Sequence, residues 1–186
     1  MAHLAKKKIS EYSWLVRGIF WAQKWKYGSV LEPAWLWGYS TPLLLAMQVY
    51  YRLLDRKGNP LSRELRALIS HRISQLNHCE FCSDLSGGSL EKLGISLEKF
   101  EQISRFSESE QFTLKEKAAL QWAEIMTLER KIPSIDEFSP LKGFFTDKEI
   151  VELTAWISFQ ILSSKFNAAL DVSPQGFCQL PGAKKS

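Results

Sequence analysis

The sequence predicts an all-α, single-domain protein, and three observations support this prediction. Apolar residues recur at three- and four-residue steps in several segments, which is the pattern of a buried helix face. Capping boxes, in which Ser or Thr is followed three residues later by Glu, start at Thr113, Ser134 and Thr146. No segment alternates convincingly between polar and apolar residues, and no hairpin signal appears.

The composition is that of an ordinary globular chain. Its 186 residues, of which 45% are hydrophobic and 24% charged, suit one domain with a full hydrophobic core. The net charge of +4 is partly carried by Lys6–Lys8 near the start and by Lys184–Lys185 near the end. We expect these groups to be solvated tails, so nucleic acid is not an expected partner.

The N-terminal region is rich in tryptophan. After a loose basic tail from Met1 to Ile9, a helix is expected from Ser10 or Glu11 to about Tyr27, with Gly28 just past its end. Five of the seven tryptophans lie in this helix and the short segment that follows it. Such a density of aromatic side chains suits either one side of the core or a contact with another subunit, and the sequence leaves both open.

The next region almost reaches the length of a membrane span, but it is interrupted. The uncharged stretch 33–51 is broken by Pro33, Gly38 and Pro42, so we expect two short buried helices in place of a span. The second of these runs from residue 41 to about residue 54. No signal peptide is visible, so we expect a cytoplasmic protein without a membrane partner.

A helix pair after this region organises the chain. Residues 62–76 predict a helix with Ser62 as its N-cap. Its apolar face consists of Leu65, Leu68, Ile69, Ile73 and Leu76. Asn77 is expected to be the N-cap of a second helix, which begins at Cys79, continues through two glycines and ends near Gly94.

The C-terminal half adds helices that the capping boxes delimit. Ser96 caps a short helix through Phe106, and a helix from residue 114 to about residue 130 follows the first capping box. A short helix follows the second box. The longest element, from residue 147 to about residue 170, is apolar on much of its circumference and should therefore be central.

Cys79 and Cys82 form a Cys-x-x-Cys motif at the expected helix start. A cysteine in a first helical turn lies near the positive end of the helix dipole, which stabilises the thiolate and lowers the thiol pKa. A second cysteine three residues later lies on the same side, so the pair can close and reopen a disulfide. Three cysteines make no disulfide framework and indicate a reducing compartment. The all-α prediction argues against a thioredoxin fold.

Zinc is the alternative for the same cysteines. It would use Cys79, Cys82 and either a histidine or Cys178, but four ligands at sound spacing are not visible. We therefore expect neither a metal nor a bound cofactor.

The helix pair resembles the core motif of the carboxymuconolactone decarboxylase superfamily, and more closely its AhpD-like alkylhydroperoxidase branch. The matching residues are LSRELRALISHRISQLNHCEFCSDLS, with weaker support from PLLLAMQVYYRLLDRKGNP before them and FTDKEIVELTAWISFQILSSKFNAALDVSPQGFC after them. The resemblance implies an AhpD-like helical bundle over residues 41–180. Residues 1–40 would then be a tail and a Trp-rich helix that packs on the core or on a neighbouring subunit.

The resemblance also implies an activity. Cys82 would attack the peroxide, and Cys79 would be the more accessible partner that exchanges with an external dithiol. The reaction would reduce a peroxide or a disulfide. Family members of this size assemble through their helices, so a homo-oligomer, a trimer or hexamer, is expected.

The chain departs from the family at the proton relay. The relay glutamate, twelve residues before the first cysteine, is Ala67 here, and the relay histidine, four residues after the second, is Ser86. Weakened peroxidase activity is therefore expected, with disulfide exchange preserved. His71, one turn from Ala67 on the same face, is the candidate substitute base, although a histidine in a helix contact is the plainer interpretation.

Two alternatives remain at this point. Lactone decarboxylation, the chemistry of the family's namesake, is opposed by the Cys-x-x-Cys motif, on which those members generally do not depend. A catalytically weakened, homo-oligomeric binding or scaffold protein on the same fold is favoured by the missing relay and opposed by the intact cysteine pair.

Overall fold

The computed structural model describes residues 2–129 and 131–180, and every regular element in these ranges is a helix, as the sequence predicts. The expected helix end at Arg130 and the basic pair Lys184–Lys185 lie outside the described residues. The elements are η1 (Ile9–Glu11), α1 (Trp14–Tyr27), α2 (Glu32–Trp37), α3 (Thr41–Leu54), α4 (Arg63–Leu76), α5 (Glu80–Lys92), α6 (Leu97–Glu101), η2 (Ile103–Arg105), α7 (Leu114–Leu128), α8 (Ile135–Lys142) and α9 (Asp147–Ala169).

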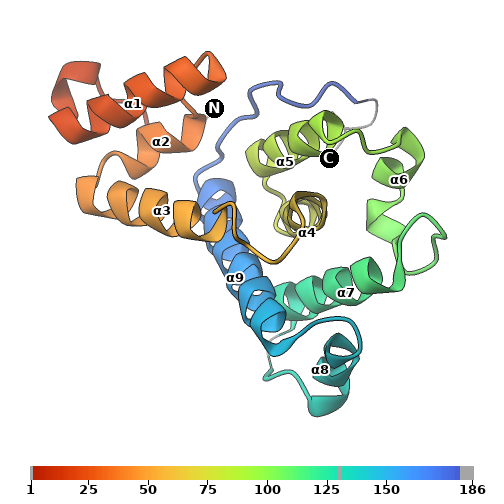
Figure 1. Cartoon of the computed structure of the whole chain (residues 1–186). Helices are drawn as coiled ribbons and strands as arrows, with labels where there is room; N and C mark the ends of the chain where they lie inside the picture. Colours follow the sequence, from red (N-terminus) through yellow and green to blue (C-terminus); the bar gives the residue numbers. More distant parts are fainter. Residues whose placement is uncertain (1, 130, 181–186) are drawn as a thin grey trace.

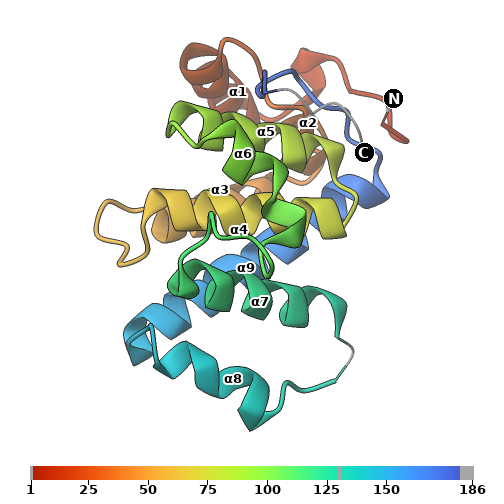
Figure 2. The ribbon, with the colours of Figure 1, turned by 90° about the vertical axis from the view of Figure 1, so that its right-hand side faces the viewer.

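Helix α4 forms the centre of the bundle. In Figure 1 it is seen nearly end-on, with α5, α6, α7 and α9 around it and α1–α3 to one side. The turned view in Figure 2 shows α7 and α8 as a layer at the opposite end of the molecule from α1. The predicted apolar residues Leu68, Ile69 and Ile73 are fully buried. Ser70 and Ser74 are buried as well, because small polar side chains fill the face of α4 that meets α9.

The N-terminal helices have a small apolar cluster of their own, made of Tyr12, Val16, Phe20, Ala34 and Leu44. The Tyr12 hydroxyl donates to the Trp35 carbonyl oxygen at 2.8 Å, which ties the start of α1 to α2. The opposite face of α1 carries Trp14, Trp21 and Trp25, all exposed. Among the described helices, none combines the length and apolar character that crossing a membrane requires.

The start of α1 differs from the prediction. The helix begins at Trp14 and not at Ser10 or Glu11, because Ser13 is the N-cap and accepts a hydrogen bond from the Val16 amide. Residues 9–11 form a separate 3-10 turn. The predicted end is confirmed, since Gly28 adopts the left-handed conformation after Tyr27.

Two further boundaries also differ. Asn77 is not the N-cap of α5: it ends α4, and its side chain donates to Ser164 on α9. Cys79 is the N-cap instead, after His78 turns the chain with a φ of 52°. The helix after Ser96 stops at Glu101 and gives way to η2, so it is shorter than predicted.

The three predicted capping boxes are present and begin α7, α8 and α9. In each, the Ser or Thr hydroxyl accepts from the backbone amide of the Glu three residues later, and the Glu carboxylate accepts from the capping residue's amide. Each cap is worth about 1 kcal/mol. These local signals therefore fix where the C-terminal helices start.

Candidate functional site

The two cysteines of the motif are joined in a disulfide at the N-terminus of α5, with a Cα–Cα distance of 5.2 Å. The Cys79 sulfur accepts the Cys82 backbone N–H at 3.2 Å and so acts as the N-cap. This contact aims a backbone N–H and the positive end of the helix dipole at Cys79, which favours its thiolate once the disulfide is reduced.

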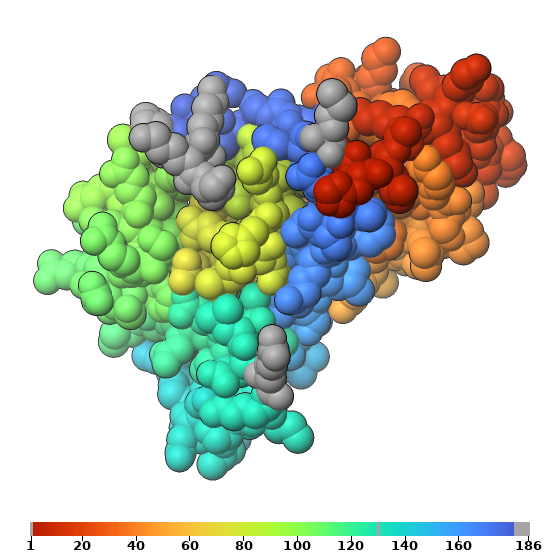
Figure 3. All heavy atoms as spheres, turned by 180° about the vertical axis from the view of Figure 1, so that it is seen from behind, coloured from red at the N-terminus to blue at the C-terminus, as the bar shows by residue number. Residues whose placement is uncertain are grey.

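Both sulfurs are buried. Cys79 is 2% exposed and Cys82 5%, so the expectation that Cys79 is the more accessible partner is wrong. Leu36 of α2 and Val172 of the C-terminal segment pack in one apolar cluster with the pair. In Figure 3 the N-terminal segment (red) lies beside the end of α9 (blue). There the His3 amide donates to the Leu170 carbonyl oxygen at 2.9 Å.

On the α4 side, His71 contacts the position of the missing relay histidine. His71 Nδ1 lies 3.1 Å from the Ser86 hydroxyl oxygen, and its Nε2 lies 3.3 Å from the Gln75 side-chain nitrogen. The Ser86 hydroxyl donates to the Cys82 carbonyl oxygen at 2.6 Å rather than to the Cys82 sulfur. Because that hydroxyl hydrogen is used, Nδ1 carries the proton that bonds to Ser86, and Nε2 accepts from Gln75.

The His71 imidazole is neutral at pH 7. The reason is that burial lowers its pKa to about 4, because the charged form loses its hydration in the bundle. Two other ionisable residues of this helix pair lie elsewhere: Glu64 pairs with Lys99 of α6, and His78 is exposed on the turn before α5. The structure thus brings His71 to Ser86, which in turn bonds to the Cys82 backbone, and it leaves Glu64 and His78 outside this contact.

On the α9 side lies a residue that the sequence interpretation missed. The Asn167 side-chain nitrogen donates to the Cys82 sulfur at 3.3 Å. A signal for it existed: Gln160, Ser164 and Asn167 are polar residues at helical spacing on a helix that was predicted to be central. Polar side chains need hydrogen-bond partners when they are buried, and the partner of Asn167 is the Cys82 sulfur.

The C-terminal segment closes over α5. The Asp84 carboxylate accepts the backbone N–H groups of Gln175 at 2.7 Å and Cys178 at 2.9 Å. Gly88 permits this approach, since a Cβ there would lie 2.6 Å from the Phe177 carbonyl oxygen. Cys178 is a buried free thiol whose pKa is raised by burial, and no group of three or more possible metal ligands occurs in the described ranges.

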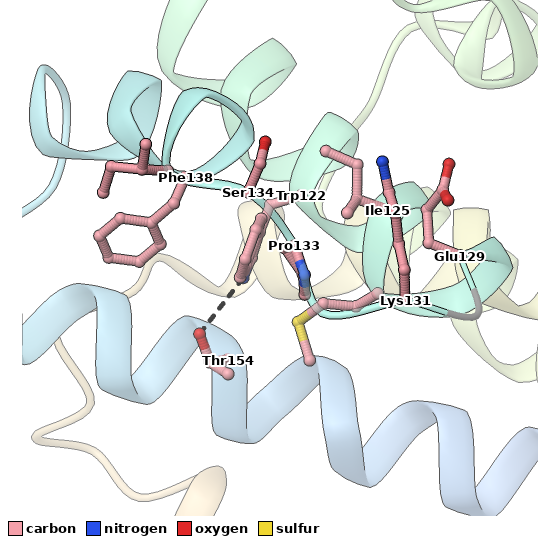
Figure 4. Close-up of a pocket in the computed structure, with 10 residues that line it drawn as sticks. Trp122, Ile125, Glu129, Lys131, Pro133, Ser134, Phe138 and Thr154 are labelled. Carbon is pink, nitrogen blue, oxygen red and sulfur yellow. Dashed lines mark hydrogen bonds between the residues drawn. The ribbon is translucent and has the colours of Figure 1, made fainter.

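A cavity of about 510 Å³ lies between α7, α8 and α9, and Figure 4 shows its lining. The Trp122 indole N–H donates to the Thr154 hydroxyl at 3.2 Å at its inner side. The lining residues are Trp122, Ile125, Met126, Glu129, Lys131, Pro133, Ser134, Ile135, Phe138 and Thr154. This cavity is therefore separate from the disulfide.

Comparison with known proteins places this arrangement in a family. The model of the carboxymuconolactone decarboxylase family matches residues 42–124. The uncharacterized protein YnjA of Escherichia coli is 31% identical over 175 residues, which cover 93% of this chain and 95% of YnjA.

Solved structures share the fold. A peroxidase-related protein from Ralstonia eutropha, described as an alkylhydroperoxidase AhpD core, superposes with a TM-score of 0.81 at 18% identity and covers 94% of this chain and 92% of its own. The debrominase Bmp8 has a TM-score of 0.78 at 17% identity over 92% and 91% of the two chains. At these identities the likeness shows the fold, and the fold hosts more than one reaction. The chain belongs to the carboxymuconolactone decarboxylase family and has its AhpD-like helical fold.

Proposed function

We propose that the protein is an AhpD-like thiol–disulfide oxidoreductase that reduces peroxides or disulfides through Cys79 and Cys82. The observation that carries the proposal is the pair itself: two sulfurs bridged across the first turn of α5, each accepting a hydrogen bond from an N–H donor. Such donors stabilise thiolates, which are the reactive form. Sulfur carries the electrons, so we expect no bound cofactor.

The proposed cycle begins with the reduced pair. The Cys82 thiolate attacks the terminal oxygen of a hydroperoxide; an S–O bond forms, the O–O bond breaks, and the leaving alkoxide takes a proton from water. Cys79 then attacks the resulting sulfenic acid, and its thiol proton leaves with the hydroxyl group as water while the disulfide forms. An external dithiol reduces the disulfide by exchange and is itself oxidised.

The missing relay limits the peroxide step. Ala67 cannot move a proton, and Ser86 already donates to a backbone carbonyl. His71 is unprotonated at neutral pH, but a base with a pKa near 4 is weak. General-base assistance contributes about a hundred- to ten-thousand-fold, so peroxide turnover should fall short of that of relay-bearing relatives by a factor in this range. Disulfide exchange depends less on this assistance.

Parallel turnover assays test the proposal. The purified protein is given a dithiol donor together with hydrogen peroxide, an organic hydroperoxide or a model disulfide. We expect consumption of at least one substrate, and thiol counting should find two more reactive thiols per chain after dithiothreitol treatment, because the disulfide opens. No consumption of any substrate, or a change confined to Cys178, would contradict the proposed function.

A scaffold or binding role is the second candidate, and the burial of both sulfurs favours it. Under this alternative the disulfide would be structural and would resist dithiothreitol in the folded protein, opening only on unfolding. The thiol count, made with and without urea, separates the two functions.

We further propose a homo-oligomer, a trimer or hexamer, that forms through α3. The exposed side of this helix carries an apolar stripe of Pro42, Leu43, Ala46, Val49, Tyr50 and Leu53, and the exposed Arg52 lies at its edge. These residues recur every three or four positions, so the stripe runs along the whole helix. Because the stripe itself carries no charge, two copies of it can pack together without bringing like charges into contact. The exposed tryptophans of α1 supply further apolar surface.

Static light scattering checks the oligomer. The wild type should give a multiple of its chain mass of 21.4 kDa. The double variant Val49→Glu, Leu53→Glu should give a monomer, because association would bury unpaired carboxylates. Leu114→Glu on α7 is the matched control: Leu114 is 69% exposed and Leu53 59%, yet Leu114 lies off the α3 face. A wild type of 21.4 kDa at micromolar concentration would refute the oligomer.

A further inference from the structure

A row of hydrogen bonds joins the two central helices and leads to the disulfide. The Trp156 indole N–H on α9 donates to the Ser70 hydroxyl at 3.0 Å, and the Gln160 amide donates to the Ser74 hydroxyl at 3.2 Å. One turn further, the Asn77 amide donates to Ser164 at 2.8 Å. These contacts advance by three or four residues on both helices, so they fix the register of α9 against α4.

Asn167 is the last polar residue of this row. It is 2% exposed, and its side-chain nitrogen donates to the Cys82 sulfur at 3.3 Å. The oxygen of the same amide, Oδ1, is buried and has no hydrogen-bond partner among the described residues. A buried acceptor without a partner costs free energy, so a hydrogen-bond donor that enters the site is stabilised by bonding to it. Because both atoms belong to one amide, this acceptor lies beside the reactive sulfur.

We propose that Asn167 is a catalytic residue that stabilises the Cys82 thiolate through its N–H and binds the hydroxyl end of a hydroperoxide through its free Oδ1. This inference rests on the proposed function and assigns its substrate class. The reacting group of a hydroperoxide carries the O–H donor that Oδ1 lacks, and the S–S group of a disulfide carries none. Held in this way, the terminal oxygen lies next to the sulfur that attacks it, and positioning substitutes in part for the missing relay.

The redox steps are those of the proposed cycle. Asn167 forms no covalent bond and transfers no proton: its N–H bond to sulfur weakens as the negative charge moves from the Cys82 thiolate to the leaving alkoxide, and its Oδ1 keeps the hydroxyl that becomes the sulfenic acid. Loss of the N–H donor should therefore disfavour the reduced form of the pair, and loss of Oδ1 should slow the peroxide step alone.

The first test measures the Cys82 thiolate. Iodoacetamide alkylation of the reduced protein is followed against pH, with Cys82 and Cys178 resolved by peptide mass spectrometry. We expect Asn167→Ala to move the Cys82 midpoint up by about one pH unit, a tenfold change, and Asn167→Asp to move it further, since a carboxylate opposes the thiolate. The Asp variant keeps the size and shape of the side chain, and its folding is verified before the titration. Ser164→Ala, in the same row but away from the sulfur, should leave the midpoint unchanged.

The second test compares substrates and separates this inference from the proposed function. At a pH above the Cys82 midpoint of both proteins, where the thiolate is fully formed, Asn167→Ala should lower the hydrogen peroxide rate by at least about tenfold and leave disulfide exchange within about twofold. Equal losses for both substrates, an unmoved midpoint in both Asn167 variants, or an equal shift in Ser164→Ala would overturn the role of Asn167. A wild type that turns over no substrate would refute the proposed function, and the alkylation midpoint would still report on Asn167.

Discussion

Cys82→Ser is expected to abolish peroxide turnover, by more than about a thousand-fold, because the attacking sulfur is lost. Cys79→Ser should behave differently. Its Cys82 can still attack, so the reduced variant should consume about one equivalent of peroxide per chain and then stop as a sulfenic acid, which has no resolving thiol. Stopped-flow measurement of the first turnover, with a sulfenic acid trap and intact mass spectrometry, distinguishes the two variants.

Cys178→Ala provides the control for these variants. Cys178 is a buried free thiol under the C-terminal segment, so its removal should leave turnover near the wild-type value once folding is verified. The reverse outcome is equally informative. If Cys79→Ser loses the first turnover and Cys82→Ser keeps it, the attacking thiol is Cys79, which the helix N-terminus favours, and the family's assignment does not transfer to this chain.

The free energy of unfolding should fall by about 2 kcal/mol between pH 7 and pH 5 because of His71 alone. Its pKa is about 4 in the folded protein, against an ordinary value of about 6.5 in the unfolded chain. Between these two values the unfolded state binds a proton that the folded state excludes, so stability is lost as pH falls and the loss ends near pH 4. Urea unfolding at both pH values measures it, with His71→Gln as a variant that cannot titrate.

The pH range separates this effect from that of the carboxylates. The pKa values of Glu149 and Glu152 are lowered, chiefly by a hydrogen bond from the Thr146 backbone and by one from Arg56, respectively. The contributions of these two glutamates to the free energy of unfolding are therefore lost only as the pH falls below the ordinary glutamate range. An equal loss of stability in His71→Gln between pH 7 and pH 5 would show that another group titrates there. The pH dependence of the turnover rate provides a second measurement. If the catalytic base were an ordinary imidazole, the rate would fall as the pH drops through 6 to 7; if the base is His71, the rate should fall only near pH 4.

Much of the fold could be predicted because its signals are local. The Ser62 cap, the apolar face of α4 and the three capping boxes each depend on residues within one or two helical turns. One of the errors lies where a contact from elsewhere intervenes. Asn77 was predicted to cap α5, but Ser164 lies opposite it and Cys79 provides the cap instead.

The sequence by itself determined the family, the helical fold and the presence of two cysteines at a helix start, since spacing along the chain encodes all three. Only the tertiary structure decided how those cysteines are surrounded. The residue whose amide contacts Cys82 is 85 positions away in the chain, and the low pKa of His71 arises from the helices that exclude water around it. The hydrogen-bond partners and the desolvation of a side chain depend on which segments pack around it, and a local pattern of residues does not specify those segments.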